Sequence, residues 1–172
     1  KEAIPVLVNV LEDVCQEPMV RHEAGEALGA IGLPEVVEPL QKYLRDPVVE
    51  VAETCELALA RIKWLQDPEA QTEKLLVNPY ASIDPAPPSA KTDVRQLKDV
   101  LLNEDESLFD RYRAMFALRN IKSKDAVLAL GCALKSGSAL FRHEIAFVLG
   151  QLQDDVSVPF LKESLEDGTE NE

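Results

Sequence analysis

A repeated pattern of about 30 residues is the feature of this sequence that most limits the folds open to it. Four stretches align with one another: Val20–Ile31, Val51–Ile62, Arg111–Leu118 and Arg142–Gly150. The first two are offset by 31 residues, and so are the last two. Another apolar-periodic stretch, such as Ile4–Leu11, precedes each copy. A unit this short cannot bury its apolar face alone, so neighbouring units must stack.

Two apolar-periodic stretches per unit predict two helices per unit. Aromatic residues make up only 5% of the chain, and a core of Leu, Val, Ile and Ala suits close-packed helices better than a sheet. Pro18 and Ser138 stand where a first-turn proline and an N-capping hydroxyl belong. One apolar stripe recurs at helical spacing in Ala24, Ala27, Leu28 and Ile31. We therefore predict an all-α fold, an α-solenoid of HEAT-like helical hairpin repeats.

Two glycines fall inside the predicted helices, Gly29 and Gly150. Glycine within a helix costs about 1 kcal/mol relative to alanine. We therefore expect a neighbouring helix to approach closely at each of them.

A proline-rich stretch interrupts the repeat. The second and third copies are 59 residues apart, about 28 more than one period. The excess falls in Leu76–Lys91, whose four prolines forbid a regular helix. We predict N-terminal repeats over residues 1–65, a linker over 66–92, and C-terminal repeats over 93–172.

The last unit is expected to be incomplete. Val158–Asp167 matches Ile4–Asp13 at an offset of 154 residues, so it predicts the first helix of another unit. The second helix of that unit would follow Glu172. A solenoid helix without its partner leaves an apolar face uncovered. We expect a chain truncated at both ends that self-associates through such surfaces.

Charge and composition exclude several classes of function. The net charge of −13 disfavours nucleic acid as a partner; it favours a basic partner or simply aids solubility. No apolar run is long enough to span a membrane. Cys15, Cys55 and Cys132 are scattered, which indicates reduced thiols in an intracellular protein. We predict a cytoplasmic protein.

The two histidines of the chain occupy equivalent repeat positions, and a glutamate follows each: His22-Glu23 and His143-Glu144. One interpretation is structural, with glutamate favoured near a helix N-terminus and braced by the preceding arginine. However, the second unit carries Glu53-Thr54 at these positions and the third Tyr112-Arg113. The fold therefore does not require His-Glu.

The other interpretation is a metal site. Imidazole and carboxylate groups suit iron, manganese or zinc, and a site with open positions suits Fe(II) and dioxygen. Two pairs facing each other could supply four ligand groups. Glu26 lies four residues after His22 and shares its helix face. It is a candidate contact for a cationic substrate or a support for a metal ligand, although a solvated surface glutamate is the favoured interpretation.

Several strings resemble the deoxyhypusine hydroxylases over essentially the whole chain: Pro18–Gly32, Asp84–Pro88, Arg111–Asn120 and Ser138–Glu144. The resemblance implies eight HEAT-type repeats in two halves, with four His-Glu motifs around two irons. It implies dioxygen-dependent hydroxylation of the deoxyhypusine side chain of translation initiation factor 5A.

Carried over to this chain, the resemblance assigns His22, Glu23, His143 and Glu144 as iron ligands, with no catalytic group separate from them. They match two of the four motifs, so we expect the chain alone to bind iron weakly and to be inactive. Two other readings remain open: a HEAT-like protein-binding scaffold without catalysis, and a repeat protein similar to the phycobilin lyases. A pure scaffold has no need of the His-Glu pairs.

Overall fold

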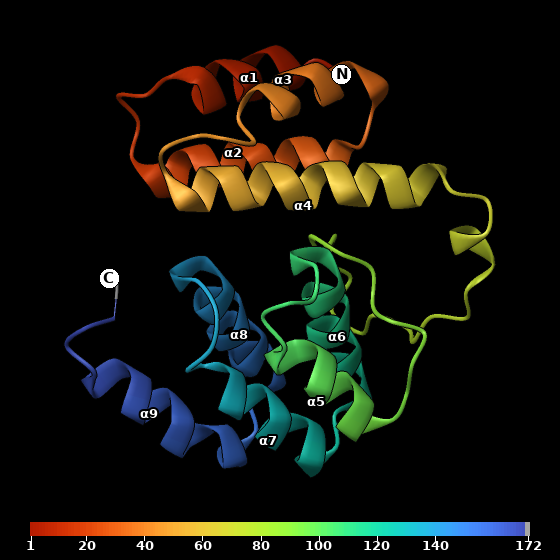
Figure 1. The fold of residues 1–172 in the computed structure, drawn as a ribbon, viewed down its shortest axis with the longest axis vertical. Helices are drawn as coiled ribbons and strands as arrows, with labels where there is room; N and C mark the ends of the chain where they lie inside the picture. Colours follow the sequence, from red (N-terminus) through yellow and green to blue (C-terminus); the bar gives the residue numbers. More distant parts are fainter. Residues whose placement is uncertain (171–172) are drawn as a thin grey trace. The chain divides into compact units, whose positions relative to one another are not determined.

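The computed structural model describes residues 1–170. Within that stretch every regular element is a helix, as Figure 1 shows. The α-helices are α1 (Ile4–Glu12), α2 (Pro18–Ile31), α3 (Val37–Lys42), α4 (Val49–Gln66), α5 (Val94–Leu102), α6 (Leu108–Ile121), α7 (Lys124–Ala133), α8 (Ala139–Leu152) and α9 (Val158–Glu166). The all-α prediction is confirmed. None of these helices is both long enough and apolar enough to cross a membrane.

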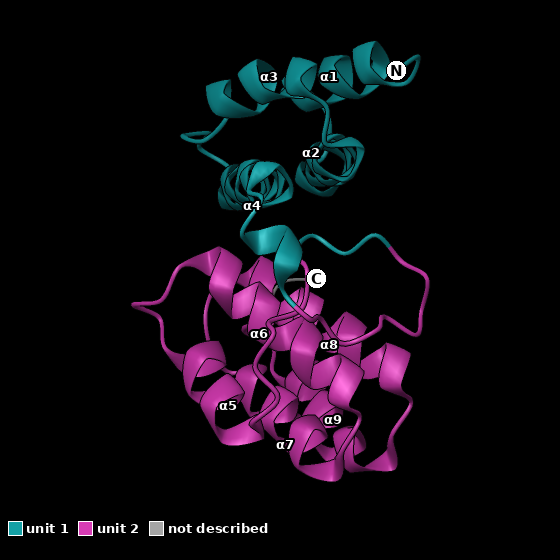
Figure 2. Ribbon diagram, turned by 90° about the vertical axis from the view of Figure 1, so that its right-hand side faces the viewer, with its two compact units in different colours: residues 1–73, 83–86 teal, residues 74–82, 87–172 magenta. Residues whose placement is uncertain are grey.

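The chain folds into two compact units, coloured separately in Figure 2. Unit 1 comprises residues 1–73 and 83–86, and unit 2 comprises residues 74–82 and those from 87 onward. In unit 1, α2 packs between α1 and α4. In unit 2, α6 and α7 pack against each other and both contact α5 and α8, while α9 packs on α7. Each unit is thus a stack of helical hairpins.

Helices α2, α6 and α8 begin and end at repeat-equivalent residues. Pro18 occupies the first turn of α2, and the Ser138 hydroxyl accepts a hydrogen bond from the backbone N–H of Phe141 at the start of α8. Left-handed backbone ends α2, α6 and α8, at Gly32 (φ 65°), Lys122 (φ 57°) and Gln153 (φ 51°). These three residues are offset by 90 and 31 positions, so the same turn geometry closes three hairpins even where glycine is absent.

No α-helix falls between Gln66 and Val94. Parts of this segment bond to the unit to which they belong. In unit 1, Arg61 Nε donates to the Asp84 carbonyl (3.2 Å). In unit 2, the Ser89 N–H donates to the Arg113 carbonyl (2.9 Å). Hydrogen bonds therefore fix the backbone of the predicted linker at these points.

A buried arginine ties the first hairpin to the second. Arg21 Nε donates to the Leu11 carbonyl (2.9 Å), and its guanidinium pairs with Asp46. Both side chains are almost fully buried, at 3% and 4% exposed. Asp46 also accepts from the N–H of Val48 ahead of α4. The hydrogen bond from Arg21 is the main reason that the pKa of Asp46 lies below its usual range.

An equivalent arginine makes the same backbone hydrogen bond in unit 2. Arg111 stands 90 residues after Arg21, and its Nε donates to the Leu101 carbonyl (3.0 Å). Its guanidinium lies 3.4 Å from the Ser136 hydroxyl, at the position equivalent to Asp46. The position that holds the Asp46 carboxylate in unit 1 therefore holds a serine hydroxyl in unit 2.

The two helix glycines differ. A Cβ on Gly29 would lie 2.6 Å from Ala58 Cβ and 2.9 Å from Ala58 Cα, so α2 and α4 approach closely there, as predicted. Gly150 has nothing within 4 Å of an added Cβ. The expectation for Gly150 is wrong, because no described helix covers that face of α8. In the same unit, Phe147 of α8 and Val158 and Leu165 of α9 are exposed, and self-association through them stays a prediction.

We predict that Asp46→Asn lowers the free energy of unfolding by about 3 kcal/mol at pH 7, because it leaves the Arg21 charge buried and unpaired. Urea titration measures this. Because the pKa of Asp46 is depressed in the fold, its contribution is fully present above an unfolded pKa of about 3.9 and lost as pH falls through the folded value. The free energies of unfolding of the two proteins should thus converge in acid.

The control is Glu12→Gln, whose exposed pair with Lys42 is worth under about 1 kcal/mol. Equal effects of the two substitutions would show that the buried Arg21–Asp46 pair contributes no more than the exposed pair.

We also predict that Gly29→Ala and Gly150→Ala change stability in opposite directions. At Gly29 the new methyl forces α2 and α4 apart, which costs about 1–3 kcal/mol. At Gly150 the methyl meets open space and gains up to about 1 kcal/mol of helix propensity. Thermal unfolding of the two variants checks the signs. A stabilised Gly29→Ala protein would show that the helices are not in contact there.

Candidate metal centre

The two His-Glu pairs occupy the same place in their helices. His22 and Glu23 lie in the second turn of α2, and His143 and Glu144 lie in the second turn of α8. Their burial is reversed: His22 and Glu144 are buried, whereas Glu23 and His143 are exposed. Unit 1 holds one pair and unit 2 the other. Equivalent sequence positions therefore have different surroundings.

The arginine that precedes each pair bonds to its own hairpins rather than to the glutamate. Arg21 bonds to Leu11 and Asp46, as described above. Arg142 bonds to both carboxylate oxygens of Glu170 and to the Gly137 carbonyl. These contacts do not match the structural interpretation in which arginine braces the following glutamate.

His22 is held by a residue of the neighbouring helix. Its Nδ1 lies 2.5 Å from Oγ1 of Thr54 on α4, and both side chains are buried. Gly25 makes this approach feasible, because a Cβ there would lie 3.0 Å from Thr54 Cγ2. The Thr54 hydroxyl in turn donates to the Glu50 carbonyl (2.7 Å). The small residues of α2 thus determine where the His22 ring lies.

Glu26 lies beside the other nitrogen of the ring. Its Oε2 is 3.7 Å from His22 Nε2, and its side chain is 30% exposed. Burial, followed by the negative charges of Glu23 and Asp84, raises the pKa of Glu26 to about 7. A cation near the ring would relieve this crowding of acidic groups. An imidazole nitrogen and carboxylate oxygens are a donor set that fits iron.

At the position equivalent to His22, unit 2 has a buried aromatic residue in α6. The ring of Tyr112 stacks edge-on against Phe141 (5.6 Å between centroids) and lies 6.3 Å from Phe116. This position in the repeat therefore does not by itself indicate a metal ligand. It becomes a candidate ligand position only where the sequence places histidine.

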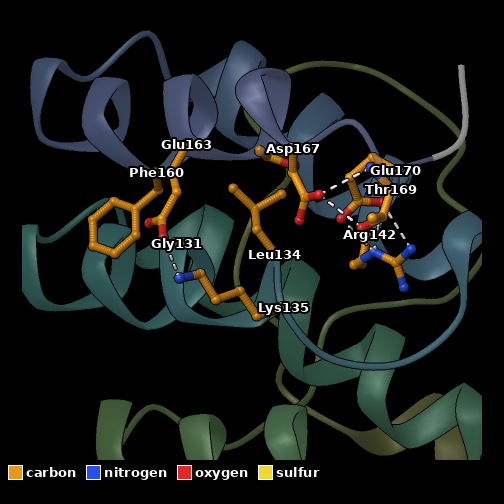
Figure 3. A pocket seen from close by; sticks show the side chains of 10 residues that line it. Gly131, Leu134, Lys135, Arg142, Phe160, Glu163, Asp167, Thr169 and Glu170 are labelled. Carbon is orange, nitrogen blue, oxygen red and sulfur yellow. Dashed lines mark hydrogen bonds and ion pairs between the residues drawn. The ribbon is translucent and has the colours of Figure 1, made fainter.

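Unit 2 also has a pocket of about 380 Å³ between α7 and α9, which contains no predicted site residue (Figure 3). Two ion pairs border it, Lys135 with Glu163 and Arg142 with Glu170. Phe160 covers Gly131 along its apolar wall. These four charged groups are paired with each other, and Asp167, which also lines the pocket, accepts hydrogen bonds from Thr169.

Sequence reasoning did not find Thr54. It follows Glu53 in the second unit, where the repeat alignment assigned no function. Its part in the site comes from the packing of α4 on α2, which the sequence of either helix alone does not specify.

Comparison with known proteins agrees with this description. The HEAT-repeat family model matches residues 1–71 and 94–172. The chain is 60% identical to the deoxyhypusine hydroxylase of Gallus gallus over 171 residues and 57% identical to that of Drosophila melanogaster over 172. Each match covers 99% of this chain and 56% of the relative. The chain thus spans about half the length of these relatives.

A solved structure is similarly close. The structure of human deoxyhypusine hydroxylase in complex with glycerol matches with a TM-score of 0.91 and 57% identity. The match covers 99% of this chain and 58% of that one. The resemblance predicted from the sequence is confirmed. The chain therefore belongs to the HEAT-repeat family, and its similarity there is to the deoxyhypusine hydroxylases.

Proposed function

We propose that this chain supplies part of the iron centre of a dioxygen-dependent hydroxylase. Its substrate would be the deoxyhypusine side chain of translation initiation factor 5A, and its place of action the cytoplasm. The observation that carries the proposal is the His22 arrangement: a buried imidazole anchored at Nδ1, with Nε2 beside a carboxylate. Identity of 57–60% to three hydroxylases over 98–99% of the chain supports it.

The proposed iron ligands are His22, Glu23, His143 and Glu144. Iron at these residues would supply the activation of dioxygen. The protein provides neutral imidazole nitrogens and anionic carboxylates, the ligand types found in non-haem iron oxygenases. Because the resemblance implies four His-Glu motifs and this chain has two, we propose that alone it binds iron weakly and does not turn over.

The substrate side chain carries amines, which are cationic at neutral pH. The chain has a net charge of −13, which attracts a cationic group over long range. We propose that Glu26 meets this amine, because its carboxylate lies beside the proposed ligand His22. Burial of Glu26 strengthens such a contact relative to one in bulk water.

The alternative is a HEAT-like scaffold that binds proteins without chemistry. It accounts for the stacked hairpins, but it gives no reason for a buried histidine beside a half-buried carboxylate. Iron binding separates the two proposals.

We predict that the chain takes up Fe(II) weakly under anaerobic conditions, and that His22→Ala and His143→Ala each reduce the affinity at least about tenfold, since each removes a neutral nitrogen ligand. Isothermal titration measures the affinity. Glu12→Gln, a surface change on α1, serves as the control and should bind as the parent does. Undiminished uptake by both histidine variants would eliminate these residues as ligands.

Activity can be tested by replacing the matching segment of human deoxyhypusine hydroxylase with this chain. We expect the chimera to hydroxylate deoxyhypusine-bearing factor 5A, with the product detected by mass spectrometry. The His143→Ala chimera should fold and remain inactive. A folded chimera that holds no iron would instead favour the scaffold.

A further inference from the structure

Thr54 of α4 belongs to neither His-Glu pair, yet its hydroxyl makes a close contact with His22. Oγ1 lies 2.5 Å from Nδ1 of the ring, and Thr54 is 3% exposed. Its neighbours in unit 1 explain its position: the Thr54 methyl group sits against Gly25, where a side chain would leave no room. A β-branched side chain has few χ1 rotamers, and the hydrogen bond to the Glu50 carbonyl holds the Thr54 hydroxyl in one of them.

The hydrogen bonds of this hydroxyl assign the proton on the ring. The Oγ1 atom of Thr54 lies 2.7 Å from the Glu50 carbonyl oxygen. The hydroxyl carries one proton, and a carbonyl oxygen can only accept a hydrogen bond. The hydroxyl therefore donates to Glu50, the usual bond of a threonine to the carbonyl four residues back. Only lone pairs of Oγ1 remain for His22. The contact is attractive only if Nδ1 carries a proton.

A neutral imidazole with its proton on Nδ1 has a bare lone pair on Nε2. In unit 1 that nitrogen faces Glu26, with 3.7 Å between Nε2 and Oε2. The lone pair of Nε2 and a carboxylate oxygen of Glu26 then lie close to each other on one side of the ring. This is an arrangement that a cation between them would stabilise.

We propose that Thr54 is a positioning residue for the metal centre: it fixes His22 in the Nδ1–H tautomer and orients the ring so that Nε2 is its ligand atom. The proposal rests on the proposed iron function and deepens it. Residues that hold the second ring nitrogen of a metal-binding histidine raise metal affinity by about 10–100-fold. Here the anchor comes from the adjacent repeat rather than from the helix that carries the histidine.

The first test reads the tautomer without metal. Nitrogen-15 NMR of the histidine-labelled, metal-free chain at about pH 8, above the usual histidine pKa of about 6.5, distinguishes a protonated Nδ1 from a bare one. The His143→Asn variant leaves His22 as the single histidine and assigns its signals. We expect Nδ1–H in the parent and in Thr54→Ser, and loss of this preference in Thr54→Val. An Nε2–H tautomer in the parent overturns the proposal, as does an unchanged tautomer in Thr54→Val.

The second test separates the hydroxyl from its packing. Thr54→Val keeps the shape and removes the hydroxyl, whereas Thr54→Ser keeps the hydroxyl and removes the methyl group. We expect Fe(II) affinity to fall about 10–100-fold in the valine variant and to be retained in the serine variant. Equal losses in both variants would mean that Thr54 acts only through packing and would overturn the proposal. If the tautomer responds as expected but the parent binds no iron, the tautomer assignment stands and the iron function fails.

Discussion

The close packing of α2 on α4 is the constraint on which the rest of unit 1 depends. Gly25 and Gly29 of α2 have no side chains that would hold the helices apart. Thr54 and Ala58 of α4 pack directly against them. Apolar side chains of both helices then share one core, which includes Leu28 of α2. The same approach carries the Thr54 hydroxyl to the His22 ring. Thus one packing contact both stabilises the hairpin stack and positions the candidate ligand.

The two units share their packing and turn geometry, and they differ at the candidate ligand position. The arginine bond to the preceding hairpin occurs in both units, at Arg21 and Arg111. Left-handed residues close α2, α6 and α8 alike. Yet the position that holds His22 in α2 holds Tyr112 in α6, packed among aromatic rings. The repeat therefore accommodates either a core aromatic residue or a histidine at one position without a change of fold.

The repeat offset was sufficient to predict the helices, because each unit contains its own periodicity and turn signals. The cap at Ser138 and the first-turn proline at Pro18 followed from local rules. The close approach at Gly29 was also predicted, whereas the same argument was wrong at Gly150. A glycine in a helix does not require a close neighbouring helix, and no described helix covers Gly150. Thr54 and the raised pKa of Glu26 depend on packing between helices far apart in sequence, so periodicity could not reveal them.

We propose that His22 binds iron through Nε2 while Thr54 holds Nδ1. Anomalous diffraction at the iron absorption edge, from crystals of the chain grown with Fe(II) under anaerobic conditions, tests it most directly. We expect an anomalous peak within bonding distance of His22 Nε2, with Thr54 Oγ1 still in contact with Nδ1. Iron bound at Nδ1, or iron only at sites remote from His22, would contradict it.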